Sequence, residues 1–410
     1  MLIVLLISLF NKNTDVFSPV RLFVIVWSLA IGLADLKLSR YQLPWSIFSW
    51  IMLLLPLLAT LTGMYVVYVL NFDESINNLY TIRRSLQVTP INSELLFRII
   101  IILFLAYLFS YLITTIVVGY ITFFAPKPDR ARMDWGIFGF GLLVQSIPAI
   151  LFLIIQYLSA SISTLTKRVL ITLIFILAFT SYFFLLERYY LVFSLFIITV
   201  FLYYRTNMLR FRNVIIVFSG LGTLFYFISS IRLSRYAINF VYYLSDMKFG
   251  VKYAIFSEPY MYVVMNLENF AYAVTKVENY TFGLLTFDPI FALTGLKHTL
   301  IEYLYIPKYP AIVNSNFNTF TMYFIYYWDF GVLGLSVIPF IFGMFFSFTY
   351  YNMRKNPDMK SVSIYSIIVF IISFSFFVPV ISFLHFIFNL IIIFFVTKKV
   401  LIRKGTPANI

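Results

Sequence analysis

Residues 99–124 read IIIILFLAYLFSYLITTIVVGYITFF and contain no charged side chain. An α-helix needs about 20 apolar residues to cross the hydrocarbon of a bilayer. Comparable stretches lie at residues 51–70, 136–160, 169–186, 214–230, 331–350 and 364–383, with shorter ones at 2–10, 22–34, 191–204 and 384–396. These runs predict an all-α, polytopic integral membrane helical bundle of about 11 transmembrane helices, in which residues 1–410 form a single membrane domain.

The composition excludes several classes of protein and of site. The chain is 62% hydrophobic and only 11% charged, whereas about a quarter of the residues in a soluble domain are charged. It has no cysteine, which excludes disulfides, thiolate catalysis and cysteine-based zinc sites. The two histidines, His298 and His385, are far apart, and no aspartate cluster has metal-binding spacing. We therefore expect neither a metal nor a cofactor.

The net charge of +14 is explained by membrane topology. With alternating helices, seventeen of the thirty lysines and arginines fall in inner loops, six in short outer loops and seven in residues 232–330. Cytoplasmic loops of membrane proteins carry such an excess. The distribution predicts a multi-pass plasma (inner) membrane protein with its N-terminus outside and its C-terminus cytoplasmic, and no nucleic-acid partner.

Residues 232–330 form the one long segment in which the apolar runs break up. Lipid-exposed irregular backbone is not tolerated within hydrocarbon, so we expect a large extracytoplasmic loop of interfacial or re-entrant helices. A loop of this size is typical of an enzyme with its site on one face of the membrane. Seven of the sixteen acidic residues fall here: Asp246, Glu258, Glu268, Glu278, Asp288, Glu302 and Asp329.

Three arginines at the expected outer edge are candidates for binding phosphate. Arg188 follows Glu187 in a predicted tight turn between two helices, and Arg232 and Arg235 lie three residues apart where a helix leaves the membrane. The guanidinium fork suits phosphate oxygens. Alternative interpretations remain open: an interfacial ion pair at Glu187–Arg188, and contact of Arg232 and Arg235 with anionic lipid headgroups.

A polar and aromatic stretch, NSNFNTFTMYFIYYWDFGVLG, occupies residues 314–334. Asn318 or Thr319 is expected to cap a helix, and Asp329 to cap a helix that begins near Gly331. Gly331 would allow close approach of a neighbouring helix. Because an amide keeps most of these hydrogen bonds, Asp329→Asn should be tolerated better than Asp329→Ala. Asp-Phe-Gly also occurs in kinases, but the other kinase motifs are absent.

The run NTFTMYFIYYWDFGVLGLSVIPFIFGMFF, residues 318–346, resembles the late signature of bacterial oligosaccharide repeat-unit polymerases, the Wzy-type O-antigen and capsular polysaccharide polymerases. Their pattern is Asn-x-x-Thr, a tyrosine-rich stretch, Asp-Phe-Gly and a glycine-containing helix. The close match covers about thirty residues, and the rest of the chain agrees only in layout. The resemblance implies a membrane glycosyltransferase that polymerises polyprenyl-diphosphate-linked repeat units on the outer face.

The resemblance also implies a donor glycan on undecaprenyl diphosphate and a lipid-linked acceptor, among membrane lipids. A chain-length regulator and a flippase are candidate further partners. Family members rely on outer-face arginines, for which Arg188, Arg232 and Arg235 are the candidate positions here. These would stabilise the leaving diphosphate without a metal, while a general base deprotonates the acceptor hydroxyl. The candidate bases are Glu187, Asp288, His298 and Glu302.

Three other functions remain alternatives. A lipid-linked oligosaccharide flippase would carry charged residues inside several spans, and the spans here hold few. A polyprenyl-phosphate-sugar glycosyltransferase would place an acidic residue in its first outer loop, where only Asp35 could serve. A related glycan ligase shares the architecture and the donor chemistry.

Overall fold

The computed structural model describes residues 15–88, 91–160, 164–206, 237–277, 279–303 and 311–402, with isolated positions between 216 and 231. Over these residues the chain is helical, with no β-strand and two isolated bridges, Ser39 to Met247 and Ile91 to Leu401. The predicted helix at 2–10 lies outside the described residues, and that at 214–230 is described only at isolated positions.

Five helical segments of the described chain are long and apolar enough to cross a membrane: Ile47–Leu70, Ser93–Phe124, Phe140–Leu158, Leu165–Phe183 and Phe324–Lys355. Met359–Phe374 is a shorter apolar helix. The prediction of a helical membrane protein is therefore confirmed at this level. The number of eleven spans and the orientation of the termini stay predictions.

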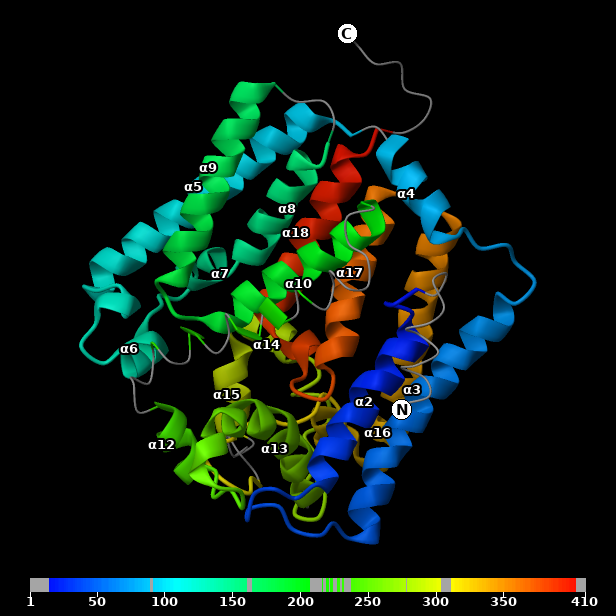
Figure 1. Cartoon of the computed structure of the whole chain (residues 1–410), viewed down its shortest axis with the longest axis vertical. Coiled ribbons are helices and arrows are strands. Elements are labelled where there is room, and N and C mark those ends of the chain that lie inside the picture. The colour runs from blue at the N-terminus through cyan, green and yellow to red at the C-terminus, as the bar shows by residue number, and fades with distance from the viewer. Residues whose placement is uncertain are drawn as a thin grey trace. The chain divides into compact units, whose positions relative to one another are not determined.

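The chain divides into two compact units, and the first comprises Met1–Ile76, Arg235–Asn352 and Ile371–Ile387. Its helices are α2 (Pro19–Asp35), α3 (Ile47–Leu70), α12 (Ala237–Leu244), η2 (Val251–Phe256), α13 (Ser257–Ala273), α14 (Asp288–Thr294), α15 (Leu296–Tyr303), α16 (Phe324–Lys355) and η3 (Val380–Ser382). Within this unit α13 packs against α2, α3 and α12 (Figure 1).

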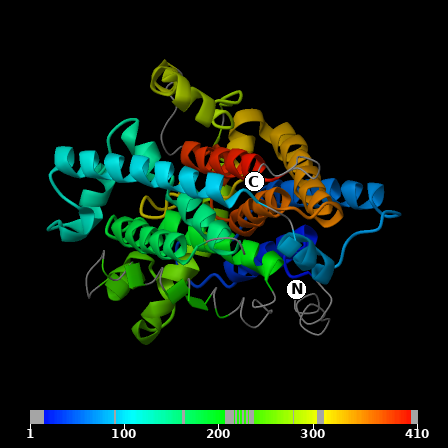
Figure 2. The same ribbon diagram turned by 90° about the horizontal axis from the view of Figure 1, so that it is seen from above.

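The second unit comprises Asn77–Ser234, Met353–Phe370 and Phe388–Ile410. Its helices are α4 (Leu79–Val88), α5 (Ser93–Val118), η1 (Thr122–Phe124), α6 (Pro128–Asp134), α7 (Phe140–Val144), α8 (Ile147–Leu158), α9 (Leu165–Phe183), α10 (Arg188–Arg205), most of α17 (Met359–Phe374) and most of α18 (Leu384–Val400). Figure 2 shows α5, in cyan, running alongside the green helices α8 and α9, with which it packs.

The apolar run at 136–160, expected as one helix, is interrupted between α7 and α8. Asn389 of α18 satisfies the backbone at this break: its Oδ1 accepts from the Ala149 N–H at 2.9 Å and its Nδ2 donates to the Gln145 carbonyl at 2.8 Å. Buried backbone groups need such partners. A single asparagine thus makes a helix break tolerable inside the unit.

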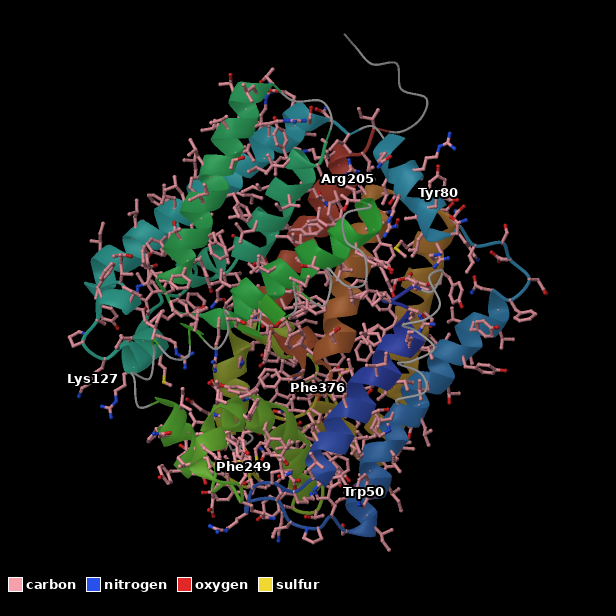
Figure 3. All side chains as sticks on the ribbon, in the orientation of Figure 1. Trp50, Tyr80, Lys127, Arg205, Phe249 and Phe376 are labelled. Carbon is pink, nitrogen blue, oxygen red and sulfur yellow. The ribbon has the colours of Figure 1, made fainter. Side chains whose placement is uncertain are left out.

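The end of α10 is fixed by a buried arginine. Arg205, labelled in Figure 3, donates to the Leu86 carbonyl at 2.6 Å and to the Ser159 carbonyl at 2.8 Å. These carbonyls lie in the last turn of α4 and immediately after α8. The guanidinium therefore ties the ends of three helices together through backbone acceptors.

Within residues 232–330, α13 differs from an interfacial helix. Its buried residues lie on all sides and include Asn266, Glu268 and Asn269. An interfacial helix would expose a polar face. The polar groups of α13 instead bind neighbouring segments of the first unit, as described below.

Candidate functional site

Asp329 holds a loop of the long segment against α16. The side chain is fully buried. Its Oδ1 accepts from the Thr281 hydroxyl and from the Leu285 N–H at 3.2 Å, and its Oδ2 accepts from the Thr286 N–H at 2.6 Å and the Thr286 hydroxyl at 2.5 Å. All four donors come from residues 281–286, which we call the clasp loop. Buried carboxylates require such compensation.

The clasp loop also pairs with α16 through its backbone. The N–H groups of Thr281 and Phe282 donate to the carbonyls of Trp328 and Asp329 at 3.0 and 3.1 Å. These carbonyls are available because Gly331, with φ 61° and ψ −141°, breaks the helical geometry inside α16. A Cβ at Gly331 would also meet the Tyr280 ring. Glycine is needed there for both its dihedrals and its size.

The sequence-based prediction for Asp329 was therefore right in placing a new helical segment near Gly331, but wrong about the carboxylate. Asp329 does not cap that segment, because its acceptors are all used by the clasp loop. The group packed closely against Gly331 is the ring of Tyr280, and not the neighbouring helix that the sequence predicted. A helix packs closely against α16 further along, where Gly343 faces the Thr60 carbonyl of α3.

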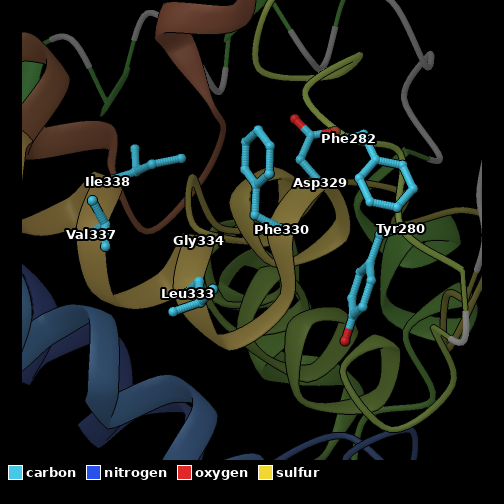
Figure 4. A pocket seen from close by; sticks show the side chains of 8 residues that line it. All are labelled: Tyr280, Phe282, Asp329, Phe330, Leu333, Gly334, Val337 and Ile338. Atoms are coloured by element: carbon cyan, nitrogen blue, oxygen red, sulfur yellow. The ribbon is translucent and has the colours of Figure 1, made fainter.

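An apolar pocket of about 390 Å³ lies beside the break in α16. Figure 4 shows the rings of Tyr280, Phe282 and Phe330 on one side and aliphatic side chains of α16 on the other. The full lining is Tyr280, Phe282, Asp329, Phe330, Leu333, Gly334, Val337 and Ile338. Because Leu333 is 74% exposed, the pocket is continuous with the outward face of an apolar helix, which suits a hydrocarbon chain.

The candidate bases of the first unit follow the clasp loop. Asp288 is the first residue of α14, and its two oxygens accept from Lys297 Nζ at 2.7 and 2.9 Å. His298 and Glu302 belong to α15, on which Glu302 is exposed. Asp288 lies two residues after Thr286, the last residue of the clasp loop. Among the hydrogen bonds of the described residues, none joins Glu302 to the clasp loop.

Asn318 and Thr319 do not cap a helix, since α16 begins only at Phe324. They lie in a non-helical stretch that α13 binds. Asn269 Nδ2 donates to the carbonyls of Phe317 at 2.5 Å and Thr319 at 2.9 Å, and the Thr319 hydroxyl donates to Asn266 Oδ1. The prediction failed because these donors and acceptors meet a partner about fifty residues away in sequence.

Glu268 is a buried charged group whose role sequence reasoning missed. Only 3% of its side chain is exposed, and its Oε1 lies 2.6 Å from Lys37 Nζ. Gln42 Nε2 and Trp45 Nε1 donate to the same carboxylate at 3.1 and 2.7 Å. The signal in the sequence was an acid in the middle of an apolar stretch, since the other acid of α13, Glu258, lies in its first turn. This cluster attaches the segment after α2 to α13.

Tyr260 extends this attachment. Its hydroxyl accepts from the Leu38 N–H at 3.0 Å and lies 2.7 Å from Gln42 Oε1, to which it donates. A tyrosine hydroxyl is ordinarily protonated at neutral pH, and burial raises the pKa of the Tyr260 hydroxyl further, so it can donate to Gln42.

Lys37→Gln is expected to lower the free energy of unfolding by about 2 kcal/mol, because it leaves the Glu268 carboxylate buried without a countercharge. The matched control is Arg40→Gln, since Arg40 and Asp246 form a pair with side chains 68% and 40% exposed. Loss of such a surface pair costs less than about 1 kcal/mol. Thermal unfolding of the purified variants measures both, and equal midpoints would contradict a structural role for Glu268.

In the second unit, Glu187 and Arg188 lie in the predicted tight turn between α9 and α10. Glu187 precedes the helix, and its Oε2 accepts from the Tyr182 hydroxyl at 2.5 Å. Arg188 is the first residue of α10 and is only 9% exposed. A cation at a helix N-terminus, where the dipole is also positive, makes the turn attractive to an anion. Arg232 and Arg235 lie outside the described residues.

The described residues contain no cluster of three or more metal-ligating side chains. The first unit offers the clasp, its pocket and Asp288, while the second offers the Glu187–Arg188 turn. Comparisons of the chain with protein-family models, curated proteins and solved structures found no match.

Proposed function

We propose that this protein polymerises polyprenyl-diphosphate-linked oligosaccharide repeat units into a surface polysaccharide at the outer face of the plasma membrane. The observation that carries the proposal is the fold of residues 318–346. The run that resembles the polymerase signature forms the broken helix, supplies the Asp329 carboxylate that the clasp loop binds, and contributes residues 329–338 to the wall of the apolar pocket. A lipid-linked substrate needs a hydrocarbon-binding surface beside a water-accessible loop. The apolar pocket supports the first requirement, and the predicted extracytoplasmic position of residues 232–330 would meet the second.

In the proposed reaction, the acceptor hydroxyl attacks the anomeric carbon of the donor's reducing-end sugar. The new glycosidic bond forms as the bond to the lipid diphosphate breaks. Arg188, with Arg232 and Arg235, stabilises the charge on the leaving diphosphate. The hydroxyl proton passes to a general base.

The candidate bases are supported to different degrees. Asp288 lies next to the clasp loop, at the start of α14. Glu187 is adjacent to Arg188, which would put a base and a phosphate ligand in one turn. His298 and Glu302 remain candidates on α15. The apolar pocket beside Asp329 is proposed to take isoprenoid units of the lipid carrier.

Arg188→Ala is expected to lower polymerisation about 100-fold, because one preorganised contact to the leaving group is lost. Arg188→Lys should recover only part of the activity, since an ammonium lacks the bidentate fork. Chain length and yield of the polysaccharide in a strain that depends on the variant are the measurement. Arg130→Ala, at an exposed arginine of α6, is the matched control and should make normal polymer.

Membrane abundance and the thermal unfolding midpoint separate catalysis from folding, since Arg188 is buried. If alanine at Arg188, Arg232 and Arg235 each gave polymer of normal length and yield, the arginine mechanism would be wrong. Loss of polymer with accumulation of single lipid-linked repeat units at the outer face would support the polymerase. Accumulation at the inner face would favour the flippase.

A further inference from the structure

A second pocket, of about 790 Å³, lies in the second unit between the start of α17 and the end of α18. Its lining combines charged and apolar side chains: Asp358, Lys360, Phe395, Lys398, Lys399, Leu401 and Ile402. None of these residues belongs to the proposed polymerase site. The distribution of lysines and arginines predicts that this end of the chain is cytoplasmic.

The pocket is positively charged. Lys360, Lys398 and Lys399 form no ion pair with any residue that the structure describes. The one carboxylate, Asp358, has its Oδ1 occupied by the Ser361 N–H at 2.6 Å. Since α17 begins at Met359, its N-terminal dipole adds to the positive potential. The pocket is therefore lined by three lysine ammonium groups and one carboxylate, and that carboxylate already accepts a hydrogen bond.

The walls of this pocket are fixed by the backbone. The Asn92 N–H donates to the Val400 carbonyl at 2.9 Å, and Ile91 forms a bridge with Leu401. The Ser361 hydroxyl donates to the Asn356 carbonyl at 3.1 Å. The chain after α18 is thus held beside the start of α5, so the lysines at the end of α18 are presented from a constrained segment.

The apolar part of the lining identifies the kind of anion. Phe395 is 60% exposed and Ile402 is 38% exposed, next to Lys398 and Lys399 in the sequence. A free phosphate would satisfy the lysines and leave these side chains uncovered, whereas an amphiphile covers both. We propose that this pocket binds an anionic glycerophospholipid, with its phosphate at Lys360, Lys398 and Lys399 and its acyl chains along Phe395 and Ile402.

The test compares binding of phosphatidylglycerol and phosphatidylcholine to the purified full-length protein by native mass spectrometry. Each lysine near an anionic headgroup contributes about fivefold in affinity. The triple variant Lys360→Gln, Lys398→Gln and Lys399→Gln should therefore bind phosphatidylglycerol about 100-fold more weakly. The matched control, Lys248→Gln, Lys252→Gln and Lys276→Gln, changes the net charge equally at three exposed lysines of the first unit and should bind like the wild type.

If the triple variant folds poorly, a second variant that is expected to bind phosphatidylglycerol more tightly still tests the proposal. Asp358→Asn retains an oxygen for the Ser361 N–H and removes the only negative charge, so phosphatidylglycerol should bind about fivefold more tightly. Unchanged binding in both the triple variant and Asp358→Asn would overturn the site. Equal competition by inorganic phosphate and by phosphatidylglycerol would show a free-phosphate site and overturn the lipid assignment.

Discussion

Gly343→Ala is expected to lower the free energy of unfolding by about 3 kcal/mol or more. A Cβ at Gly343 would overlap the Thr60 carbonyl of α3, and a Cβ at Gly63 would overlap the Phe340 carbonyl of α16. The obstacles are backbone atoms of neighbouring helices, which cannot rotate away as a side chain can. The two helices must therefore separate at this point, and the close packing around Gly63 and Gly343 is lost.

Thermal unfolding and the yield of monodisperse protein after detergent extraction measure this effect. The matched control is Gly32→Ala in α2, where an added Cβ has no neighbour within 4 Å. Alanine in a helix is intrinsically preferred to glycine by up to about 1 kcal/mol, so this variant should be as stable as the wild type or slightly more so. A Gly343→Ala protein with an unchanged midpoint would show that α3 and α16 are not held at this distance.

Asp329→Ala is expected to lower the free energy of unfolding by about 4 kcal/mol. The change leaves the partly buried N–H groups of Leu285 and Thr286 and two threonine hydroxyls without their acceptor, and an unsatisfied buried group costs about 1–3 kcal/mol. Asp329→Asn keeps one oxygen but turns an amide N–H toward a backbone donor, so its loss should be about half as large. The order predicted from the sequence, with asparagine tolerated better than alanine, is retained for a different reason.

Asp246→Asn provides the comparison for Asp329, because the Asp246 carboxylate forms an exposed pair and its loss should have little effect. Thermal unfolding and polymer yield should be measured on the same preparations. If Asp329→Asn had normal stability and abundance but made no polymer, Asp329 would act in the reaction and not in the clasp.

The helices of the described chain were largely predictable, because apolar runs of this length specify them locally. The prediction fails where the hydrogen bonds missing at a helix break are supplied by a residue distant in sequence. The interruption between α7 and α8 depends on Asn389, which lies some 240 residues later. Pro148, in the first turn of α8, is a local mark of the break, but nothing within residues 136–160 shows that a distant side chain will supply hydrogen bonds there.

Individual residues of the candidate site were predictable from the sequence, but the contacts between them were not. The sequence identified Asp329 and Gly331 as unusual and placed Glu187 and Arg188 in a turn. It did not identify the donors to Asp329, since threonines such as Thr281 and Thr286 look like ordinary loop residues. Glu268 was overlooked because burial of an acid depends on its partners, here Lys37, Gln42 and Trp45.

The break at Gly331 has a consequence for biosynthesis. The carbonyls of Trp328 and Asp329 lose their helical partners there and bind the clasp loop instead, and unsatisfied carbonyls in hydrocarbon cost several kcal/mol each. The clasp loop precedes α16 in the chain, so the ribosome makes it first. We expect the clasp loop to have left the ribosome before α16 enters the bilayer. Its N–H groups would then be available as hydrogen-bond partners while the nascent helix inserts.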